Sequence, residues 1–426
     1  MRTLKFVKYF SSFGWESIVL TVKKPIVQYY DTTLLKEIPF AVRVIRTLSL
    51  EFDWNKVIFG RKHYKDNPLL CSKKIIKPSF IGKIVKRLKW WFSFPDSRTG
   101  WIPFCIFSGY KLIKKEKIDV IYVSAEPFSA FISGVLLKKL TGKPLVLDFR
   151  DEWVGFSKYY FPEKPMLLLK IEKILEAWFI KNADKVISVT DSIIAQFRER
   201  YPKEDKDKFS CVTNGFDPSD FNVKVENKEN TYNNLFTIVY AGSLYGARNP
   251  MSFLEAINRC IAIKPDFLRK IKIKFIGEMP PDIFDIINRL PSMNSIIEMT
   301  GFVCHEAALQ QMAKSEALLY IEDESLVSSR ILPAKIFEYM ALRVPIIALA
   351  GKGEVKKVIE ETGTGVVFSH QDIDSISDYL FSCLDYFEKK QPHLVVKIND
   401  SIDRFSRIKT ALQLTQIFSQ LSNHDK

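Results

Sequence analysis

The 426-residue sequence lacks the features that would place it in a membrane or outside the cell. It has no uninterrupted run of about 20 apolar residues, the length that a bilayer-spanning helix needs. Its N-terminus also lacks the basic, apolar and small-residue regions of a secretory signal peptide. Both absences predict a cytoplasmic protein.

Cysteine and histidine are scarce and scattered. The six cysteines include no pair separated by two residues, which argues against a disulfide framework and against a zinc site. The five histidines form no metal-binding spacing, and no paired-acid metal motif stands in a suitable loop. We therefore expect no obligatory metal and no cofactor.

Charge is divided unevenly along the chain, whose formal net charge is +14. Residues 1–210 carry 39 Lys and Arg against 22 Asp and Glu, whereas residues 211–426 carry 24 against 27. The halves therefore differ in sign, at +17 and −3. This asymmetry predicts two domains with different partners, the first meeting an anion such as phospholipid, a lipid pyrophosphate or nucleic acid. A merely solvated basic surface is the alternative.

Length and apolar content also favour two domains. With 47% apolar residues, the chain can fill two cores of ordinary size. Residues 225–235 are polar, rich in Asn and Glu, and without apolar periodicity, as in an exposed connection. The predicted division is an N-terminal domain over 1–222, a C-terminal domain over 235–400, and a helix over 401–426 that can cross back to the first domain.

Short apolar segments alternate with helical patterns in both halves. In the first half the expected strands are 17–22, 119–124, 144–149 and 185–190, and a long helix is expected over 165–182. Such alternation predicts parallel sheets, whose ligands collect at the carboxyl ends of the strands. The predicted fold is α/β, with two Rossmann-like, doubly wound parallel-sheet domains facing a cleft. Expected strands of the second half are 237–243, 271–277, 295–301, 316–322 and 344–350.

Eight sequence segments, taken in order, resemble one known family. The chain resembles the family 4 retaining glycosyltransferases of the GT-B fold, of the bacterial surface-polysaccharide type. The segments are RTLKFVKYF with FGWESIVLT, DVIYVSAEPFSAFISG, GKPLVLDFRDEW, ADKVISVT, VTNGFDPSDF, VYAGSLYGARNP, TGFVCHEAAL and PAKIFEYMALRVPIIAL.

The resemblance implies a reaction and its partners. The second domain would hold a nucleotide-sugar donor, and the first would hold the acceptor, without an obligatory metal. The expected reaction transfers a sugar with retention to a lipid-linked saccharide in capsule, exopolysaccharide or O-antigen synthesis. The expected location is the inner membrane face, on an anionic membrane surface, with no nucleic acid as partner.

The chain departs from the family pattern at its beginning. Relatives have a further strand and a glycine-rich turn before RTLKFVKYF, whereas here Met1 stands directly before Arg2. We expect the first domain to lack its central strand, so that either the start lies upstream or this form is impaired. Exposed strand edges would also make such a chain poorly soluble.

The first donor-site candidate is the segment GSLYGARNP. Gly242, Ser243 and Gly246 allow the backbone to approach an anion, and a departing diphosphate is best stabilised by cations and helix N-termini. By resemblance, Arg248 stands where the family has a phosphate-binding lysine, while Ser243 replaces an arginine. Ordinary strand-to-helix turn chemistry is the alternative.

The second candidate is the segment SSRILPAKIFEYMA. Pro333 suits a first helical turn, and Glu338 lies on the inward side of the helix that follows. The resemblance assigns Glu338 to the ribose hydroxyls; a glutamate that satisfies the helix dipole is the alternative. Arg330 stands where many relatives have a glutamate near the sugar. Either Arg330 or Lys335 can restore the phosphate charge lost at Ser243.

The nucleotide base is assigned by resemblance alone. It would lie beside the backbone around Gly277 and beside Gly301, Phe302 and Val303. His305 begins a predicted helix and is interpreted as a capping or polar surface residue.

Candidate acceptor residues follow two strands of the first half. The segment PLVLDFRDEW places Asp148, Arg150 and Asp151 at the end of a buried strand. Arg150 can contact phosphate, and Asp151 can orient or deprotonate an acceptor hydroxyl; an Arg–Asp pair that closes the domain is the alternative. Glu126 follows another strand and either faces the acceptor or caps a helix.

An aromatic and basic segment, residues 80–107, is the candidate membrane contact. Basic stems beside indoles suit an anionic lipid interface. Packing in a core, or stacking on single-stranded nucleic acid, are the alternatives. The enzyme context favours lipid. The residues concerned are Lys83, Lys86, Arg87, Lys89, Trp90, Trp91, Phe92, Phe94 and Trp101.

Two other functions compete with the transferase. A catalytically silent nucleotide-sugar-binding or scaffolding partner fits the absent strand and the absent acid at Arg330. A nucleotide-sugar epimerase of the same fold would need acids and histidines around the sugar, which the sequence does not offer. No convincing carboxylate nucleophile is present, so the resemblance implies substitution on one face of the sugar, assisted by the leaving phosphate.

Overall fold

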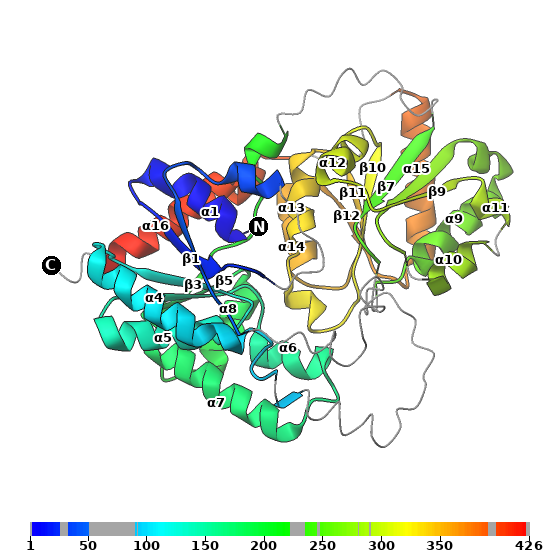
Figure 1. The fold of residues 1–426 in the computed structure, drawn as a ribbon. Coiled ribbons are helices and arrows are strands. Elements are labelled where there is room, and N and C mark those ends of the chain that lie inside the picture. The colour runs from blue at the N-terminus through cyan, green and yellow to red at the C-terminus, as the bar shows by residue number, and fades with distance from the viewer. Residues whose placement is uncertain are drawn as a thin grey trace. The chain divides into compact units, whose positions relative to one another are not determined.

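The computed structural model describes residues 2–25, 33–50, 90–91, 93–221, 235–244, 248–279, 281–288, 291–390 and 398–422. These residues form two compact units, shown with their elements in Figure 1. Unit 1 comprises the described residues up to Asn214 together with those from Arg407 onward, and unit 2 comprises those from Gly215 to Ser406. The chain therefore changes unit after Asn214 and again after Ser406.

Unit 2 is built on one parallel sheet of six strands, in the order β12-β11-β10-β7-β8-β9. From β7 the chain adds β8 and β9 on one side, and then β10, β11 and β12 on the other. The order of strands thus reverses between β7 and β10, where open α/β sheets bind ligands. The strands are β7 Phe236–Ala241, β8 Ile271–Ile276, β9 Ile297–Gly301, β10 Ala317–Ile321, β11 Ile346–Leu349 and β12 Gly365–Phe368.

Helices cover both faces of this sheet, because its central strands β7 and β10 are almost entirely apolar and buried. One core cluster joins the sheet to α9, α10, α11 and α15, and another joins it to α12, α13 and α14. The helices are α9 Met251–Ile263, α10 Pro281–Asn288, α11 Pro291–Asn294, α12 His305–Ala313, α13 Ala334–Ala341, α14 Glu354–Thr362 and α15 Ile373–Glu388.

The described strands of unit 1 form two separate parallel sheets. Four strands pair in the order β3-β4-β5-β6, and two others pair as β1-β2. Strand β3 lies at an edge and is only half-buried up to its last residue, Ala125. The strands are β1 Ile18–Val22, β2 Arg43–Thr47, β3 Ile121–Ala125, β4 Leu145–Phe149, β5 Lys185–Ser188 and β6 Phe209–Cys211.

The first and last helices of unit 1 pack against each other (Figure 1). Phe10 meets Phe418 edge-on at 5.6 Å between ring centroids, within a core cluster that also includes Phe6. The helix expected over 401–426 begins at Arg407, after a 3-10 turn over Asp400–Phe405. The unit's helices are α1 Arg2–Phe10, α4 Ile102–Lys115, α5 Ser129–Thr141, α6 Trp153–Tyr160, α7 Met166–Asn182, α8 Asp191–Arg200 and α16 Arg407–Ser422.

The aromatic and basic segment over 80–107 falls only partly within the described residues. Residues 80–89 and 92 lie outside them. Trp101 is half-buried and donates its indole N–H to Thr47 Oγ1 at 2.8 Å, so this side chain has a structural role in unit 1. Trp91 is exposed. Among the helices that the structure describes, none is long and apolar enough to span a bilayer.

Candidate functional site

Three glycines shape the carboxyl ends of β7, β8 and β9. Gly242, Gly277 and Gly301 have φ values of +124°, +129° and +68°, a region that side chains disfavour. Gly242 N donates to Ile276 O at 2.8 Å, and Gly277 N donates to Gly301 O at 2.9 Å. A Cβ on Gly277 would lie 2.5 Å from the Gly242 carbonyl oxygen. Only glycine lets these turns come so close, and the turns expose backbone at the strand ends.

Lys335 lies beside the Gly242 turn. Its Nζ donates to Tyr240 Oη at 3.1 Å and lies 4.5 Å from the centre of the Tyr240 ring and 5.1 Å from that of Tyr320. A Cβ on Gly242 would be 3.7 Å from Nζ. Cation–π contacts stabilise an ammonium that has lost part of its water. The first turn of α13 therefore places a cation at the strand ends.

A buried carboxyl group and a second cation accompany Lys335. Glu322 directly follows β10, is 4% exposed, and accepts a hydrogen bond from Tyr320 at 3.0 Å. Burial raises the pKa of Glu322 to about 7, against the opposing charge of Arg248. Burial and Arg248 lower the pKa of Lys335 to about 7, while Glu322 opposes that shift. The cluster of Lys335, Arg248, Glu322 and the two tyrosines therefore contains two groups, Lys335 and Glu322, whose pKa values lie near neutral pH.

Glu338 lies on α13 one turn after Lys335, a spacing that places both side chains on one side of the helix. Its Oε1 is 3.1 Å from Nε2 of His305, the first residue of α12. Both side chains are partly exposed, at 28% and 42%. The sequence interpretation of His305 as a capping or surface residue missed this contact.

The other predicted donor residues also belong to unit 2. Arg330 ends a 3-10 turn over Ser328–Arg330, and Pro333 immediately precedes α13. Phe302 follows β9 and is 80% exposed, whereas Val303 packs against the core beneath. The Ser243 carbonyl oxygen accepts a hydrogen bond from Tyr240 at 3.4 Å. Gly246 lies outside the described residues.

In unit 1, Arg150 connects the ends of two strands. Its Nε donates to Ala125 O at 2.5 Å and its Nη2 donates to Glu126 O at 2.8 Å. Burial raises the pKa of Glu126, with a further contribution from the charge of Asp151, and burial also raises the pKa of Asp151. Both carboxyl groups thus favour proton binding near the carboxyl ends of β3 and β4. A contact of Arg150 with phosphate stays a prediction.

Asp148 lies inside β4 and is fully buried. It accepts hydrogen bonds from Arg2 Nε at 2.9 Å, Tyr122 Oη at 2.5 Å and Ser124 Oγ at 3.0 Å. The other N–H groups of Arg2 reach the segment that follows β6. We assign Asp148 a structural role, because its oxygens are engaged from three directions. The further acceptors of Arg2 are Val212 O, Thr213 O and Asn214 Oδ1.

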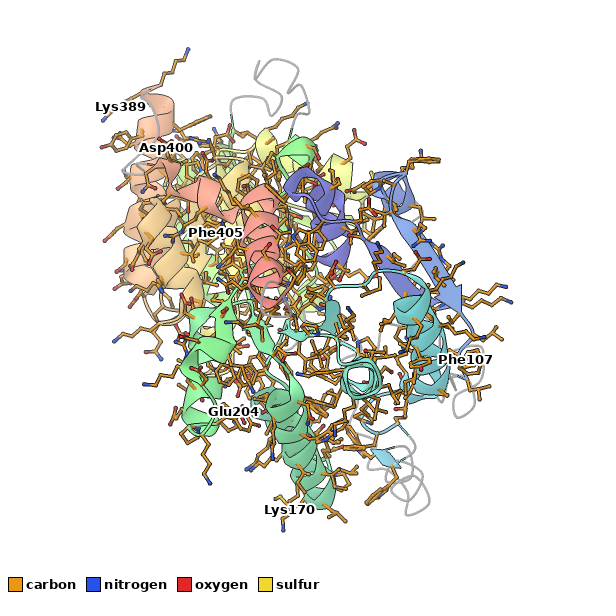
Figure 2. The ribbon with its side chains drawn as sticks, turned by 90° about the vertical axis from the view of Figure 1, so that its left-hand side faces the viewer. Phe107, Lys170, Glu204, Lys389, Asp400 and Phe405 are labelled. Atoms are coloured by element: carbon orange, nitrogen blue, oxygen red, sulfur yellow. The ribbon has the colours of Figure 1, made fainter. Side chains whose placement is uncertain are left out.

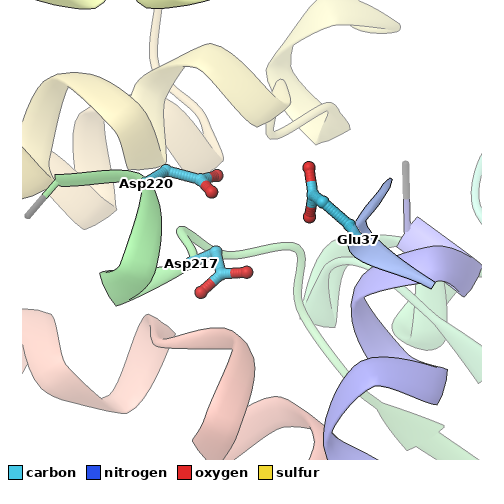
Figure 3. A group of neighbouring side chains, drawn as sticks. All are labelled: Glu37, Asp217 and Asp220. Atoms are coloured by element: carbon cyan, nitrogen blue, oxygen red, sulfur yellow. The ribbon is translucent and has the colours of Figure 1, made fainter. Parts of the chain in front are cut away.

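Figure 3 shows three carboxylates that belong to different units. In unit 2, Asp217 accepts hydrogen bonds from the backbone and hydroxyl of Ser219 at 3.1 and 2.9 Å, and Asp220 lies in the adjoining 3-10 turn. In unit 1, Glu37 pairs with Lys5 at 2.6 Å. Asp217 and Glu37 therefore each have a local contact in their own unit.

Comparison with protein families identifies both halves of the chain. The model for Glycosyltransferase Family 4 matches residues 66–220, and that for Glycosyl transferases group 1 matches residues 236–385. The chain is a family 4 GT-B glycosyltransferase. No curated protein matches its sequence.

Solved structures share the fold of this glycosyltransferase at low identity. A glycosyltransferase from Rickettsia africae ESF-5 is 17% identical, with a TM-score of 0.60 over 99% of this chain and 94% of its own. Anabaena Alr3699/HepE, in complex with UDP and glucose, is 14% identical, with a TM-score of 0.59 over 98% and 95%. The lipopolysaccharide outer core galactosyltransferase WaaB is 15% identical, with a TM-score of 0.55 over 98% and 94%. The prediction of two Rossmann-like α/β domains is confirmed.

Sequence reasoning missed three residues of the glycosyltransferase's charged cluster, namely Tyr240, Tyr320 and Glu322. A usable signal was present, because EALLYIED places carboxylates directly after a buried strand. The same signal drew attention to PLVLDFRDEW. The tyrosines carried no signal, since aromatic residues in a buried strand are typical of a core.

Proposed function

We propose that unit 2 binds a nucleotide-sugar donor at the carboxyl ends of its strands. Lys335 and Arg248 would bind the diphosphate beside the turns at Gly242 and Ser243, and Glu338 would accept the ribose hydroxyls. The observation that carries the proposal is the Lys335 ammonium at 3.1 Å from Tyr240, beside a glycine with positive φ. A cation held in a partly desolvated place stabilises a departing phosphate more strongly than one in water.

The proposed reaction transfers the sugar with retention to a lipid-linked saccharide in capsule, exopolysaccharide or O-antigen synthesis. The bond from the anomeric carbon to phosphate breaks, and a bond to the acceptor oxygen forms on the same face. The acceptor proton passes to the leaving phosphate or to Asp151, and Glu126 helps to orient the acceptor. No obligatory metal is proposed, because the two cations supply the positive charge. UDP and glucose in the Anabaena relative support the donor class.

The remaining donor residues receive roles in the same scheme. The base would lie against the backbone at Gly277, with the exposed ring of Phe302 and the backbone of Val303 beside it. Arg330 would approach the phosphate or the sugar, and Pro333 would fix the start of α13. An aromatic ring and exposed backbone suit a planar base, since both offer flat surfaces for contact.

The proposed location is the cytoplasmic face of the inner membrane, as a peripheral protein. The net charge of +17 over residues 1–210 supports attraction to anionic lipid. WaaB, which has the same fold, is named a lipopolysaccharide outer core galactosyltransferase. We propose no nucleic acid partner.

One observation favours a second candidate, a catalytically silent nucleotide-sugar-binding partner. By resemblance, Arg330, which ends a 3-10 turn, stands where many family members carry a glutamate near the transferred sugar. A donor that binds without turnover, even with lipid acceptors supplied, would support this candidate.

The test is binding and hydrolysis of a panel of UDP-, GDP- and ADP-sugars by the purified chain. Glu338→Ala is the site variant, and Glu360→Ala, an exposed glutamate on α14, is the matched control. The expected result is selective binding and turnover of one donor, weakened by Glu338→Ala and unchanged by Glu360→Ala. The proposal is wrong if the folded chain binds none of the donors.

A further inference from the structure

Helix α7 of unit 1 buries its acidic side chains and exposes several apolar ones, which reverses the usual distribution. A surface helix normally buries apolar side chains and exposes its carboxylates. Here both glutamates of the helix, Glu172 and Glu176, are fully buried. Met166, Leu167 and Ile174 instead face solvent, at 64%, 55% and 67% exposure.

The buried glutamates are held by partners within unit 1. Glu172 pairs with the buried ammonium of Lys164. Glu176 accepts hydrogen bonds from Arg200 at 2.6 Å, Tyr201 at 2.8 Å and the backbone N–H of Val154 at 3.1 Å. The carboxylates therefore neutralise inward-facing cations, and the outer face of α7 carries no negative charge of its own.

The exposed charges of this region are almost all positive. Over residues 158–182 the only exposed carboxylate belongs to Glu163, in the turn between α6 and α7. Figure 2 labels one of the exposed lysines, Lys170, on α7. Long lysine stems can lie along an apolar layer while their ammonium groups reach phosphate. The exposed lysines are Lys158, Lys170, Lys173 and Lys181.

Aromatic side chains extend the exposed apolar surface from α7 onto the end of α6. Tyr159, Tyr160 and Phe161 are 43%, 51% and 49% exposed. The ring of Phe161 meets the indole of Trp90 edge-on at 5.4 Å, and the neighbouring Trp91 is also exposed. Indoles and phenols are the side chains that prefer the boundary between lipid headgroups and acyl chains.

We infer that this α6–α7 face, comprising Trp91, Tyr159–Phe161, Met166, Leu167, Lys170, Lys173 and Ile174, docks the protein on an anionic phospholipid bilayer. Charge complementarity selects this occupant, because apolar groups ringed by lysines match acyl chains beneath anionic headgroups. The inference rests on the proposed function, whose membrane location it assigns to a defined surface. It also fits a lipid-linked acceptor, since α6 begins two residues after Asp151.

The test is flotation of the full chain with vesicles of equal parts phosphatidylcholine and phosphatidylglycerol, compared with phosphatidylcholine alone. The charge variant is Lys170→Glu with Lys173→Glu. Its matched control is Lys203→Glu with Lys206→Glu, which changes the net charge equally at exposed lysines after α8. The expected result is binding of the wild type to the anionic vesicles, at least about twentyfold weaker for the charge variant and little changed for the control.

An apolar variant, Leu167→Ser with Ile174→Ser, completes the test. Both side chains are exposed, so the melting temperature should stay that of the wild type while vesicle binding falls severalfold. The inference is overturned if the wild type ignores anionic vesicles, or if the charge variant and its control bind equally. It is also overturned if the apolar variant instead dissociates a dimer seen by light scattering, because the face would then bind a second copy.

Donor binding, measured without vesicles, separates this inference from the proposed function. All surface variants should bind the donor as the wild type does, since their substitutions lie on unit 1. Vesicle binding without any donor binding would contradict the transferase and leave the docking surface standing. Donor binding without vesicle binding would support the proposed function and overturn the docking surface.

Discussion

Each unit contains a cluster of charged side chains, and the two clusters differ in whether acidic or basic groups are in excess. In unit 1, Arg200 lies between Glu152 and Glu176, whose side chains are at most 1% exposed. In unit 2, Lys335 and Arg248 act on the single buried carboxyl group of Glu322. The first cluster has more acids than cations, and the second has more cations than buried acids.

The setting of each cluster explains the difference. Arg200 joins the start of α6 to α7 and α8, and Tyr201 adds a further hydrogen bond to Glu176. This arrangement stabilises helix packing. The Lys335 cluster lies instead at strand ends beside glycines with positive φ, at the edge of the sheet where open α/β folds bind ligands. Similar residue types thus stabilise helix packing in one unit and, under the proposed function, bind a ligand in the other.

The largest expected effect is on stability, from Arg200→Met. The substitution removes a half-buried guanidinium and leaves the buried carboxylates of Glu152 and Glu176 without their cation, so the free energy of unfolding should fall by about 3 kcal/mol. Urea unfolding measures it. The folded fraction should bind the donor as the wild type does. Unchanged stability would show that the unit 1 cluster is not a structural support.

Next in size is the loss of donor affinity from Lys335→Met. Charge-assisted hydrogen bonds to phosphate should make this loss about a hundredfold. Without ligand, the Lys335→Met variant should be as stable as the wild type, because the substitution removes a cation that is unfavourably desolvated in the fold. Calorimetric titration measures the affinity, with Lys389→Met at the exposed end of α15 as the control (Figure 2). Equal affinities for the two variants would contradict the site.

A smaller effect is expected from pH. Because the pKa of Lys335 is lowered to about 7, its charged fraction falls as pH rises above that value. The affinity for UDP-glucose, whose phosphates keep a constant charge there, should fall up to about tenfold per pH unit above 7. Lys335→Arg keeps its charge and should flatten this slope; a slope that persists would assign the titration to another group.

The same pKa values fix the sign of the effect on stability without ligand. Above pH 7 the unfolded chain binds the lysine proton that the folded chain has released, so stability should rise with pH until the ordinary lysine range. Glu322 acts oppositely below pH 7, because its raised pKa gives a stability that is lost as pH rises from its ordinary range to about 7. Urea unfolding at several pH values, with Lys335→Met and Glu322→Gln, separates the two contributions.

The smallest expected effect comes from His305→Asn. The histidine contacts Glu338 at 3.1 Å in a partly exposed position, so its loss should weaken donor binding only severalfold, about as much as one surface hydrogen bond. Glu338→Gln should cost more, because the charged acceptor is removed. Equal losses would mean that the pair acts as one unit, and a combined variant measures that coupling.

The sequence predicted most strands and helices because their apolar patterns are local. The strand over β4 and the helix over α7 fall where the pattern placed them, since a continuous apolar run and a long helical period need no distant partner. Strand β2 was not predicted; two of its five residues, Arg43 and Arg46, are exposed arginines that mask its pattern.

The residues whose roles were not predicted from the sequence depend on partners that are distant along the chain. The sequence interpretation placed Asp148 among the site residues after a buried strand, but its main partner is Arg2, which lies 146 residues earlier in the chain. Glu172 and Glu176 have the pattern of solvated helix residues, and only the folded arrangement turns them inward. The candidate donor residues Arg248, Lys335 and Glu338 came from motif resemblance, whereas the tyrosines around Lys335 needed the sheet to bring β7 and β10 together.

Thermal unfolding with UDP, GDP and ADP is the most direct test of an anion site at Lys335. The three nucleotides share the ribose and the diphosphate and differ only in the base. Wild type, Lys335→Met and Lys389→Met should be compared at pH 7. We expect at least one nucleotide to raise the melting temperature of the wild type and of Lys389→Met, but not that of Lys335→Met. An equal rise in all three proteins, or no rise in any, would contradict an anion site at Lys335.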